Sequence, residues 1–241
     1  MVLSKDYGLQ SNVLADVIHG EVPAMILSRK MTYYNIHTHH SSTNPDEKAI
    51  ISIDIRNPRP LDPSLYYSAG IHPWYASEDL FNALQTITKQ SNIVAIGEAG
   101  LDKLTPTPWE LQKKLFLAQI NLAENLEKPL IIHCVKAWPE LLAIHKTSRP
   151  SVPWIIHGFR GKGELAHQLI QLGFYLSFGR HYQTKAIYEA WNSKRLFVET
   201  DDKEICIQKI YTSTSATLGI SQEMLSEEIL SNLQTWPLAP F

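Results

Sequence analysis

Short apolar runs alternate with helical patterns along the chain from Tyr33 onward. The short runs are rich in Ile, Val, Tyr or Phe and are apolar nearly throughout, which is typical of strands buried on both faces. The eight predicted strands are Tyr33–His37, Ala49–Ile55, Tyr66–Ile71, Ile93–Gly97, Leu130–Cys134, Trp154–His157, Phe174–Phe178 and Leu196–Glu199.

Helical patterns follow the third and later strands. In the longest, Leu111, Leu115 and Leu122 belong to a stripe with a 3.6-residue period. The predicted helices are Ser77–Lys89, Thr107–Glu127, Ala137–Thr147, Gly163–Leu172, Thr184–Asn192, Lys203–Leu218 and Ser221–Leu233. The first two connections, about ten residues each, are too short for a full helix and its loops.

Strands that alternate with helices predict parallel βαβ units, and eight of them predict a closed α/β barrel of the TIM type, (β/α)8, irregular in its first two βα units. A doubly wound open sheet is the alternative fold. No G-x-G-x-x-G follows any predicted strand, so the sequence does not support a Rossmann dinucleotide site.

The length of 241 residues suits one such barrel, and we assign it to residues 31–241. Residues 1–30 carry no strand pattern and no secretory signal pattern. We interpret them as an N-terminal extension: an appended helix, a disordered arm, or translation from an upstream start codon.

Composition and charge narrow the setting of the protein. Apolar residues make up 44% and charged residues 19%, a balance typical of globular proteins. The net charge of −2 gives no evidence for a nucleic-acid partner, although metals and a few local cations can hold phosphates. Two cysteines without a C-x-x-C pair, and no apolar run of membrane-spanning length, predict a reducing, cytoplasmic protein. No protein partner is indicated.

Histidines and acids fall at the carboxyl ends of the predicted strands. In a barrel these ends form one rim, where active sites are built, so side chains far apart in sequence would converge. His37 and His39 lie two apart on a strand and therefore share a face. The candidate metal ligands are His37, His39, Glu98, His133, His157 and Asp201.

Four histidines and two carboxylates suit Zn²⁺, Mn²⁺, Ni²⁺ or similar borderline divalent ions. Six ligands exceed what one ion takes while it leaves room for water, so we expect two ions with a carboxylate bridge. Each residue alone has a simpler interpretation: His133 as a core histidine, for example, and Asp201 as the cap of the helix Lys203–Leu218. The joint pattern at five strand ends favours the metal centre.

Other polar residues on the rim are candidates for substrate binding. His72, Lys136 and Arg160 follow the third, fifth and sixth strands and could hold a phosphate by charge-assisted hydrogen bonds. For Lys136 and Arg160, a solvated loop charge is an equally good interpretation. Cys134 follows His133 and should point toward the helices as a small core residue.

Seven motifs in order resemble the TatD family of metal-dependent deoxyribonucleases over roughly residues 33–235. They are N-I-H-T-H-H at 35–40, A-G-I-H-P-W at 69–74, A-I-G-E-A-G-L-D at 95–102, I-I-H-C-V-K-A-W at 131–138, I-I-H-G-F-R-G at 155–161, G-F-Y-L-S-F-G at 173–179 and F-V-E-T-D-D at 197–202.

The resemblance implies a TIM-type barrel, a site for two divalent ions, with Mg²⁺ also a candidate, and 3′-to-5′ exonuclease activity toward DNA. It implies one metal on His37, His39 and Asp201, another on His133 and His157, and Glu98 as the bridge. Two departures concern substrate contacts. The family's longer segment after its final E-T-D is missing, so that Lys203 is expected to lead straight into a helix, and the fifth-strand motif lacks an arginine.

Three functions follow from this pattern. The first is a nuclease in which Asp201 orients and deprotonates a metal-activated water and Glu98 joins the two ions. The second is a hydrolase of a small ester, amide or phosphate on the same centre, since fold does not fix the substrate. The third, a non-catalytic metal-binding interaction module, leaves Asp201 beside an open metal site without a use.

Overall fold

A computed structural model of the protein describes residues 31–237 and residue 241. Residues 31–241 form one compact unit. The expectation that residues 1–30 are an extension falls outside the described residues and stays a prediction.

Eight parallel strands form the centre of this unit, in the order β1 to β8, each paired with its sequence neighbour. They are β1 (Tyr33–Thr38), β2 (Glu47–Asp54), β3 (Tyr66–Gly70), β4 (Ile93–Asp102), β5 (Leu130–Val135), β6 (Trp154–Ile156), β7 (Tyr175–Phe178) and β8 (Leu196–Val198). The ring closes just beyond β8, where Asp201 pairs with Thr38 of β1. The predicted barrel is therefore confirmed, and a doubly wound sheet is excluded because its strand order would reverse.

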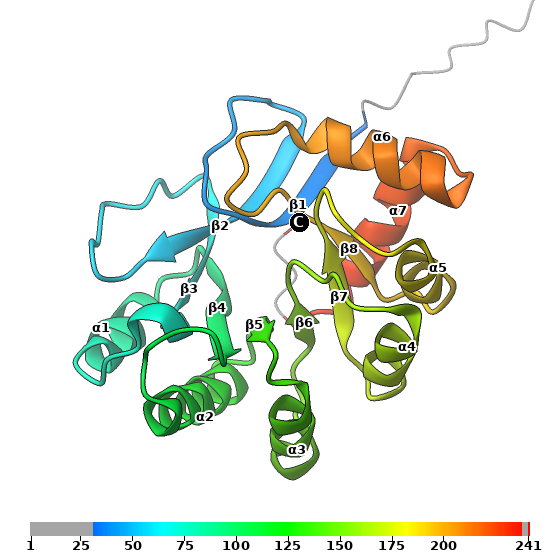
Figure 1. Ribbon diagram of the computed structural model, residues 1–241. Coiled ribbons are helices and arrows are strands. Elements are labelled where there is room, and N and C mark those ends of the chain that lie inside the picture. Colours follow the sequence, from blue (N-terminus) through cyan, green and yellow to red (C-terminus); the bar gives the residue numbers. More distant parts are fainter. Residues whose placement is uncertain (1–30, 238–240) are drawn as a thin grey trace, which may run out of the picture. The chain divides into compact units, whose positions relative to one another are not determined.

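Helices lie outside the strands along most of the barrel, as Figure 1 shows. The short 3₁₀ helix η1 (Pro73–Tyr75) and α1 (Leu80–Ile87) follow β3. The others are α2 (Trp109–Asn125), α3 (Trp138–Ser148), α4 (Gly163–Gln171), α5 (Thr184–Asn192), α6 (Ile207–Leu218) and α7 (Gln222–Leu233). No helix follows β1 or β2, so the expected irregularity of the first two units is confirmed. Among the described helices, none is both long and apolar enough to cross a membrane.

The core lies between the strands and the helices. All ten residues of β4 and all residues of β6, β7 and β8 are buried. Strands covered on both faces need apolar side chains on both, which is why they appear in the sequence as continuous apolar runs and not as alternating patterns.

Two predicted boundaries differ more from the structure than the others do. The fourth strand continues from Gly97 to Asp102, where it pairs with Val135 of β5. The predicted helix Lys203–Leu218 is wrong at its start, because α6 begins at Ile207 after a cap at Cys206. Asp201 has a left-handed backbone with φ of 56°, so the chain turns there before any helix can form. Asp201 therefore does not cap this helix.

Candidate metal centre

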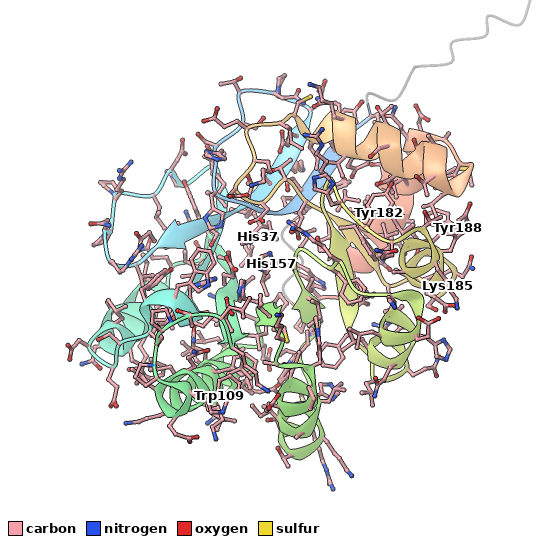
Figure 2. The ribbon with its side chains drawn as sticks, in the orientation of Figure 1. His37, Trp109, His157, Tyr182, Lys185 and Tyr188 are labelled. Atoms are coloured by element: carbon pink, nitrogen blue, oxygen red, sulfur yellow. The ribbon has the colours of Figure 1, made fainter. Side chains whose placement is uncertain are left out.

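The strand ends bring the six predicted ligands to one place on the barrel rim. His37 is fully buried at the end of β1, Glu98 is 7% exposed on β4, and His157 follows β6. Figure 2 shows His37 and His157 inside the ring of strands. His39, His133 and Asp201 complete the group, with side chains exposed by 40%, 12% and 25%.

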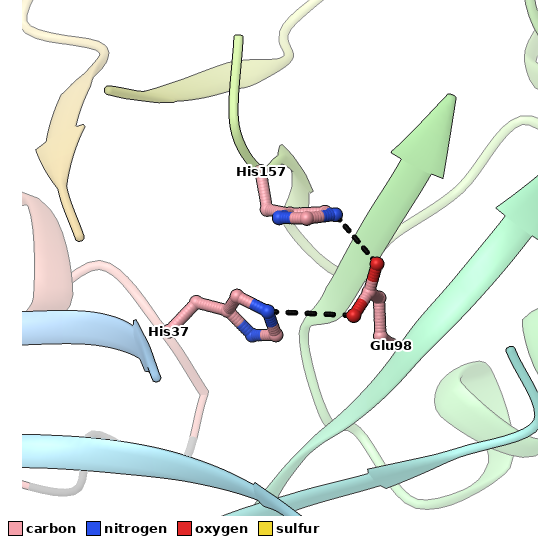
Figure 3. Close-up of side chains that lie close together, drawn as sticks. All are labelled: His37, Glu98 and His157. Carbon is pink, nitrogen blue, oxygen red and sulfur yellow. Dashed lines mark ion pairs between the residues drawn. The ribbon is translucent and has the colours of Figure 1, made fainter. Parts of the chain in front are cut away.

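The two carboxylate oxygens of Glu98 face two different sets of ligand atoms. Glu98 Oε2 lies 3.4 Å from His37 Nε2 and 3.6 Å from His39 Nε2. Glu98 Oε1 lies 2.8 Å from His133 Nδ1 and 2.6 Å from His157 Nε2. Figure 3 shows His37 and His157 approaching opposite oxygens of this carboxylate. A carboxylate shared in this way is the arrangement that a bridge between two ions requires.

The spacing of the first set fits a bound cation better than direct hydrogen bonds. Asp201 Oδ1 lies 3.6 Å from His37 Nε2 and 3.7 Å from His39 Nε2, beyond normal hydrogen-bond length. Ligand atoms about 2.0–2.1 Å from a tetrahedral Zn²⁺ would lie roughly 3.3–3.4 Å apart. Among the described residues, neither buried ring nitrogen of His37 has a hydrogen-bond partner. Histidine and carboxylate atoms therefore surround a position that a divalent ion fits.

The carboxylates of this centre are held in their ionised form. Burial opposes ionisation of Glu98, but His157, His133 and His37 outweigh it and hold its pKa well below the ordinary value. Burial also opposes the charge of Asp201, and contacts with His37 and His157 lower its pKa to about 2. Anionic oxygen ligands at neutral pH are what a divalent cation needs, because metal ligands must be deprotonated.

His37 carries the opposite shift. Burial and the nearby His157 disfavour its protonated form, but Asp201 and Glu98 outweigh them and raise its pKa to about 9. The raised pKa reports how strongly negative the environment of its ring is. The same two carboxylates would attract a divalent ion.

Two buried acids behind the centre orient its histidines, and neither was among the predicted site residues. Asp102 Oδ2 lies 3.2 Å from His133 Nε2, which leaves Nδ1 to face Glu98. Glu199, fully buried, accepts a hydrogen bond from the Gly158 N–H at 2.7 Å and lies 3.4 Å from His157 Nδ1. Partners of this kind fix the ring orientation of metal-ligating histidines. Asp102 lies in the motif at 95–102 and Glu199 in the motif at 197–202. Their place in these motifs was the signal in the sequence that could have identified them.

His72 lies against the same centre with a defined tautomer. Its Nδ1 accepts a hydrogen bond from the Trp74 backbone N–H at 3.0 Å, so the ring proton is on Nε2. Nε2 then donates to Glu98 Oε1 at 3.0 Å. Burial lowers the pKa of His72 and keeps it neutral. The structure thus places His72 as a donor to the shared carboxylate, and its contact with substrate stays a prediction.

The two cations predicted for substrate binding occupy different places. Arg160 lines a small cavity of about 80 Å³ together with Glu199 and Asp201. Arg180 and Lys203, which were not among the predicted site residues, line the same cavity from the segments after β7 and β8. Lys136 lies directly after β5 and is exposed. It is not among the described residues that line this cavity. The positive charge beside Asp201 therefore comes from Arg160, Arg180 and Lys203.

A larger groove opens on the other side of the centre, at His39. It has a volume of about 930 Å³ and runs along the β2–β3 connection, where Arg56 and Arg59 line it. Asp54 holds the Arg56 guanidinium through two hydrogen bonds of 2.8 and 2.9 Å. A groove of this volume next to a candidate metal ligand has room for a ligand larger than the metal centre itself would hold.

Cys134 is not a nucleophile in this structure. Burial raises the pKa of its thiol to about 12, so it stays protonated at neutral pH. Its side chain packs against the hydrophobic core, as the sequence predicted.

Comparison with known proteins places this geometry in a family context. Residues 35–233 match the family described as TatD related DNase. The chain is 32% identical over 148 residues to the uncharacterized metal-dependent hydrolase YabD of Bacillus subtilis, an alignment that covers 57% of this chain and 58% of that protein. It is 31% identical over 147 residues to the 3'-5' ssDNA/RNA exonuclease TatD of Klebsiella pneumoniae, with 56% of each chain covered. The matches span little more than half the length of these relatives.

Solved structures share the fold. The TatD homolog YJJV of Escherichia coli superposes with a TM-score of 0.67 at 20% identity, covering 86% of this chain and 97% of that one. A TatD family hydrolase of Entamoeba histolytica gives a TM-score of 0.66 at 17% identity, covering 84% and 96%. At these identities the likeness concerns the fold alone.

Proposed function

Because this chain belongs to the TatD related DNase family, we propose that it is a divalent-metal-dependent nuclease that hydrolyses DNA phosphodiester bonds from a strand end. The observation that carries the proposal is the Glu98 carboxylate, whose two oxygens face two sets of histidines on the barrel rim. A 3'-to-5' direction and a single-stranded or frayed substrate are part of the proposal, supported by the similarity to the 3'-5' ssDNA/RNA exonuclease TatD of Klebsiella pneumoniae.

In this proposal the six ligands hold two ions. His37, His39 and Asp201 would hold one and His133 and His157 the other, with Glu98 between them. Zn²⁺, Mn²⁺, Ni²⁺ and Mg²⁺ are the candidate ions. Ions bound here would supply Lewis-acid stabilisation of the phosphodiester and lower the pKa of a bound water to near neutrality.

The residues of the chain would position the substrate and move the proton. Asp201, ionised and partly exposed, is the acceptor for the proton of the attacking water. His72 keeps Glu98 in place through its Nε2 proton. Arg160 and Arg180, next to Asp201, would meet the charge of a substrate phosphate.

The charge distribution favours a short contact with a flexible strand over a grip on a long duplex. The net charge is −2, so binding relies on the metals and a few local cations such as Arg56 and Arg160. Each phosphate neutralised contributes about −0.7 to the slope of log affinity against log salt for single strands. Few neutralised phosphates predict a shallow salt dependence.

The proposal is tested by digestion of end-labelled single strands, duplexes and closed circular DNA with Mg²⁺, Mn²⁺ or Zn²⁺. We expect shortening of single strands from the 3' end and no cutting of closed circles. Rapid cutting of closed circles would refute the end-directed activity. Asp201→Asn serves as the inactive control, and Glu164→Gln, at an exposed carboxylate of α4 that pairs with Lys185 of α5, serves as the neutral one.

A hydrolase of small esters, amides or phosphates is the second candidate, favoured by the net charge of −2. Turnover of chromogenic esters or phosphodiesters without cleavage of any DNA would establish it in place of the nuclease. We keep a cytoplasmic location in the proposal because Cys134 and Cys206 are both free thiols, which suits a reducing compartment.

A further inference from the structure

Trp74 is a large aromatic side chain that the chain leaves in solvent at the edge of the metal centre. It is 63% exposed, although it lies in η1 directly after the buried strand β3. Its ring centroid lies 4.9 Å from that of His72 and 6.1 Å from that of His133. An exposed tryptophan next to candidate metal ligands is unusual, since burial of an apolar side chain of this size stabilises a fold.

The indole is nevertheless held rigidly. Its Nε1–H donates to Asp102 Oδ2 at 2.7 Å, and its backbone N–H donates to His72 Nδ1 at 3.0 Å. The Thr107 hydroxyl donates to its carbonyl oxygen at 3.1 Å. The inward N–H edge is thus anchored, while most of the ring surface stays accessible. A group fixed before binding loses little conformational freedom on binding.

We propose that Trp74 is the stacking platform for one nucleobase of the substrate strand. This inference rests on the proposed nuclease function. Every base has an aromatic face, so stacking on a fixed indole suits single strands of any sequence. The position fits, because the Trp74 ring contacts His72 and His133 at the edge of the candidate metal centre, where a base next to a bound phosphate would lie. The N–H edge is already bonded to Asp102, which leaves the ring surface as the part available to a ligand.

Neighbouring residues support a base over a charged group. Leu104, 65% exposed, is held beside Trp74 because its backbone N–H donates to the other oxygen of Asp102 at 2.7 Å. The Arg56 guanidinium lies 3.7 Å from the ring centre of Tyr75, the next residue in η1. The two exposed apolar side chains on opposite oxygens of Asp102 suit a nucleobase, which is apolar on its faces.

The test combines variants of Trp74 with strands that lack one base. Trp74→Ala removes the ring, and Trp74→Phe keeps a ring but loses the same hydrogen bond to Asp102, so the comparison isolates stacking. Tyr188→Ala, at an exposed aromatic on α5 far from His37 and His157 in Figure 2, is the control. Single strands with one abasic nucleotide, moved stepwise from the 3' end, locate the base.

We expect Trp74→Ala to lower kcat/KM on intact strands by about 5- to 150-fold, the factor that corresponds to about 1–3 kcal/mol of base stacking. Trp74→Phe should lose much less. On strands that are abasic at one particular position, wild type and Trp74→Ala should become equal. Binding of a phosphorothioate strand, followed by fluorescence anisotropy, should show the same pattern without turnover.

An equal loss for Trp74→Ala on intact and on every abasic strand would overturn the proposal, because the ring would then act on the protein alone. Activity unchanged in Trp74→Ala would overturn it too, while the nuclease function would stand. If the wild-type protein cleaved no DNA, the nuclease function itself would fail. If Trp74→Ala instead altered self-association or capture of a protein, the surface would be a protein interface.

Discussion

Asp102 offers the sharpest test of how the centre is built, because it touches a candidate ligand without being one. Its carboxylate is 3% exposed and contacts three donors: the Trp74 indole N–H at 2.7 Å, the Leu104 N–H at 2.7 Å and His133 Nε2 at 3.2 Å. We predict that Asp102→Ala weakens zinc binding at the His133 side by about 10- to 100-fold, the range for loss of an orienting partner. This range corresponds to about 1.4–2.7 kcal/mol.

The variant Asp102→Asn should behave differently. An amide oxygen can keep the bonds to Trp74 and His133, but the amide NH₂ would then face the Leu104 N–H, leaving one donor unpaired at a cost of about 1–3 kcal/mol in stability. We therefore expect Asp102→Asn to lower the free energy of unfolding while it weakens zinc affinity less than Asp102→Ala does.

Zinc affinity is measured by competition with a chromogenic chelator and stability by urea unfolding, with Asp54→Ala as the matched strand-end control. The exposed Asp54 carboxylate contacts Arg56 and Asn57, so its loss should leave zinc binding unchanged. Wild-type zinc affinity in Asp102→Ala would refute the positioning argument.

Three further predictions concern the ligands, the extension and a glycine. Each ligand variant should abolish hydrolysis while circular dichroism shows a folded barrel, since the rim lies outside the packed core. A variant that retained activity with metal supplied would show that its residue is not a ligand. The variants are His37→Ala, His133→Ala and Asp201→Asn. A chain that begins at Met31 should keep solubility and activity, and loss of either would give residues 1–30 a role. A Cβ on Gly100, where φ is 154°, would collide with the His133 carbonyl oxygen. Gly100→Ala should therefore cost about 1–3 kcal/mol or more in urea unfolding, with Gly173→Ala, which meets no neighbour, as the strain-only control.

Much of the fold was predictable because the barrel imposes a simple pattern on the sequence. Every predicted strand overlaps an observed one, since strands covered on both faces must be apolar runs. The part of β4 beyond Gly97 was missed because Gly97 and Gly100 disfavour a strand by propensity. Contact with β5 explains their presence, as a side chain at either position would meet the backbone of that strand.

The candidate ligands were predictable for the same reason, since a strand end fixes where a side chain lies even when its orientation is unknown. The second layer was not. Asp102 and Glu199 lie at or just beyond strand ends too, but only the three-dimensional contacts reveal that they face His133 and His157. Lys203 follows the turn at Asp201, and Arg180 lies in the connection between β7 and α5; no periodicity predicts the course of either segment.

The shared oxygen of Asp102 links the proposed stacking platform to the metal centre. Its Oδ2 contacts both the Trp74 N–H and His133 Nε2, so the two donors compete for one acceptor. Trp74→Phe removes the Trp74 N–H, which is the closer of the two donors, and leaves that oxygen to His133. An orienting carboxylate raises the basicity of a histidine ligand. We therefore predict that Trp74→Phe binds zinc as tightly as the wild type or more tightly, as chelator competition would measure. Weaker binding by tenfold would mean that the indole holds Asp102 in place, and that the aromatic platform is part of the support of the metal site.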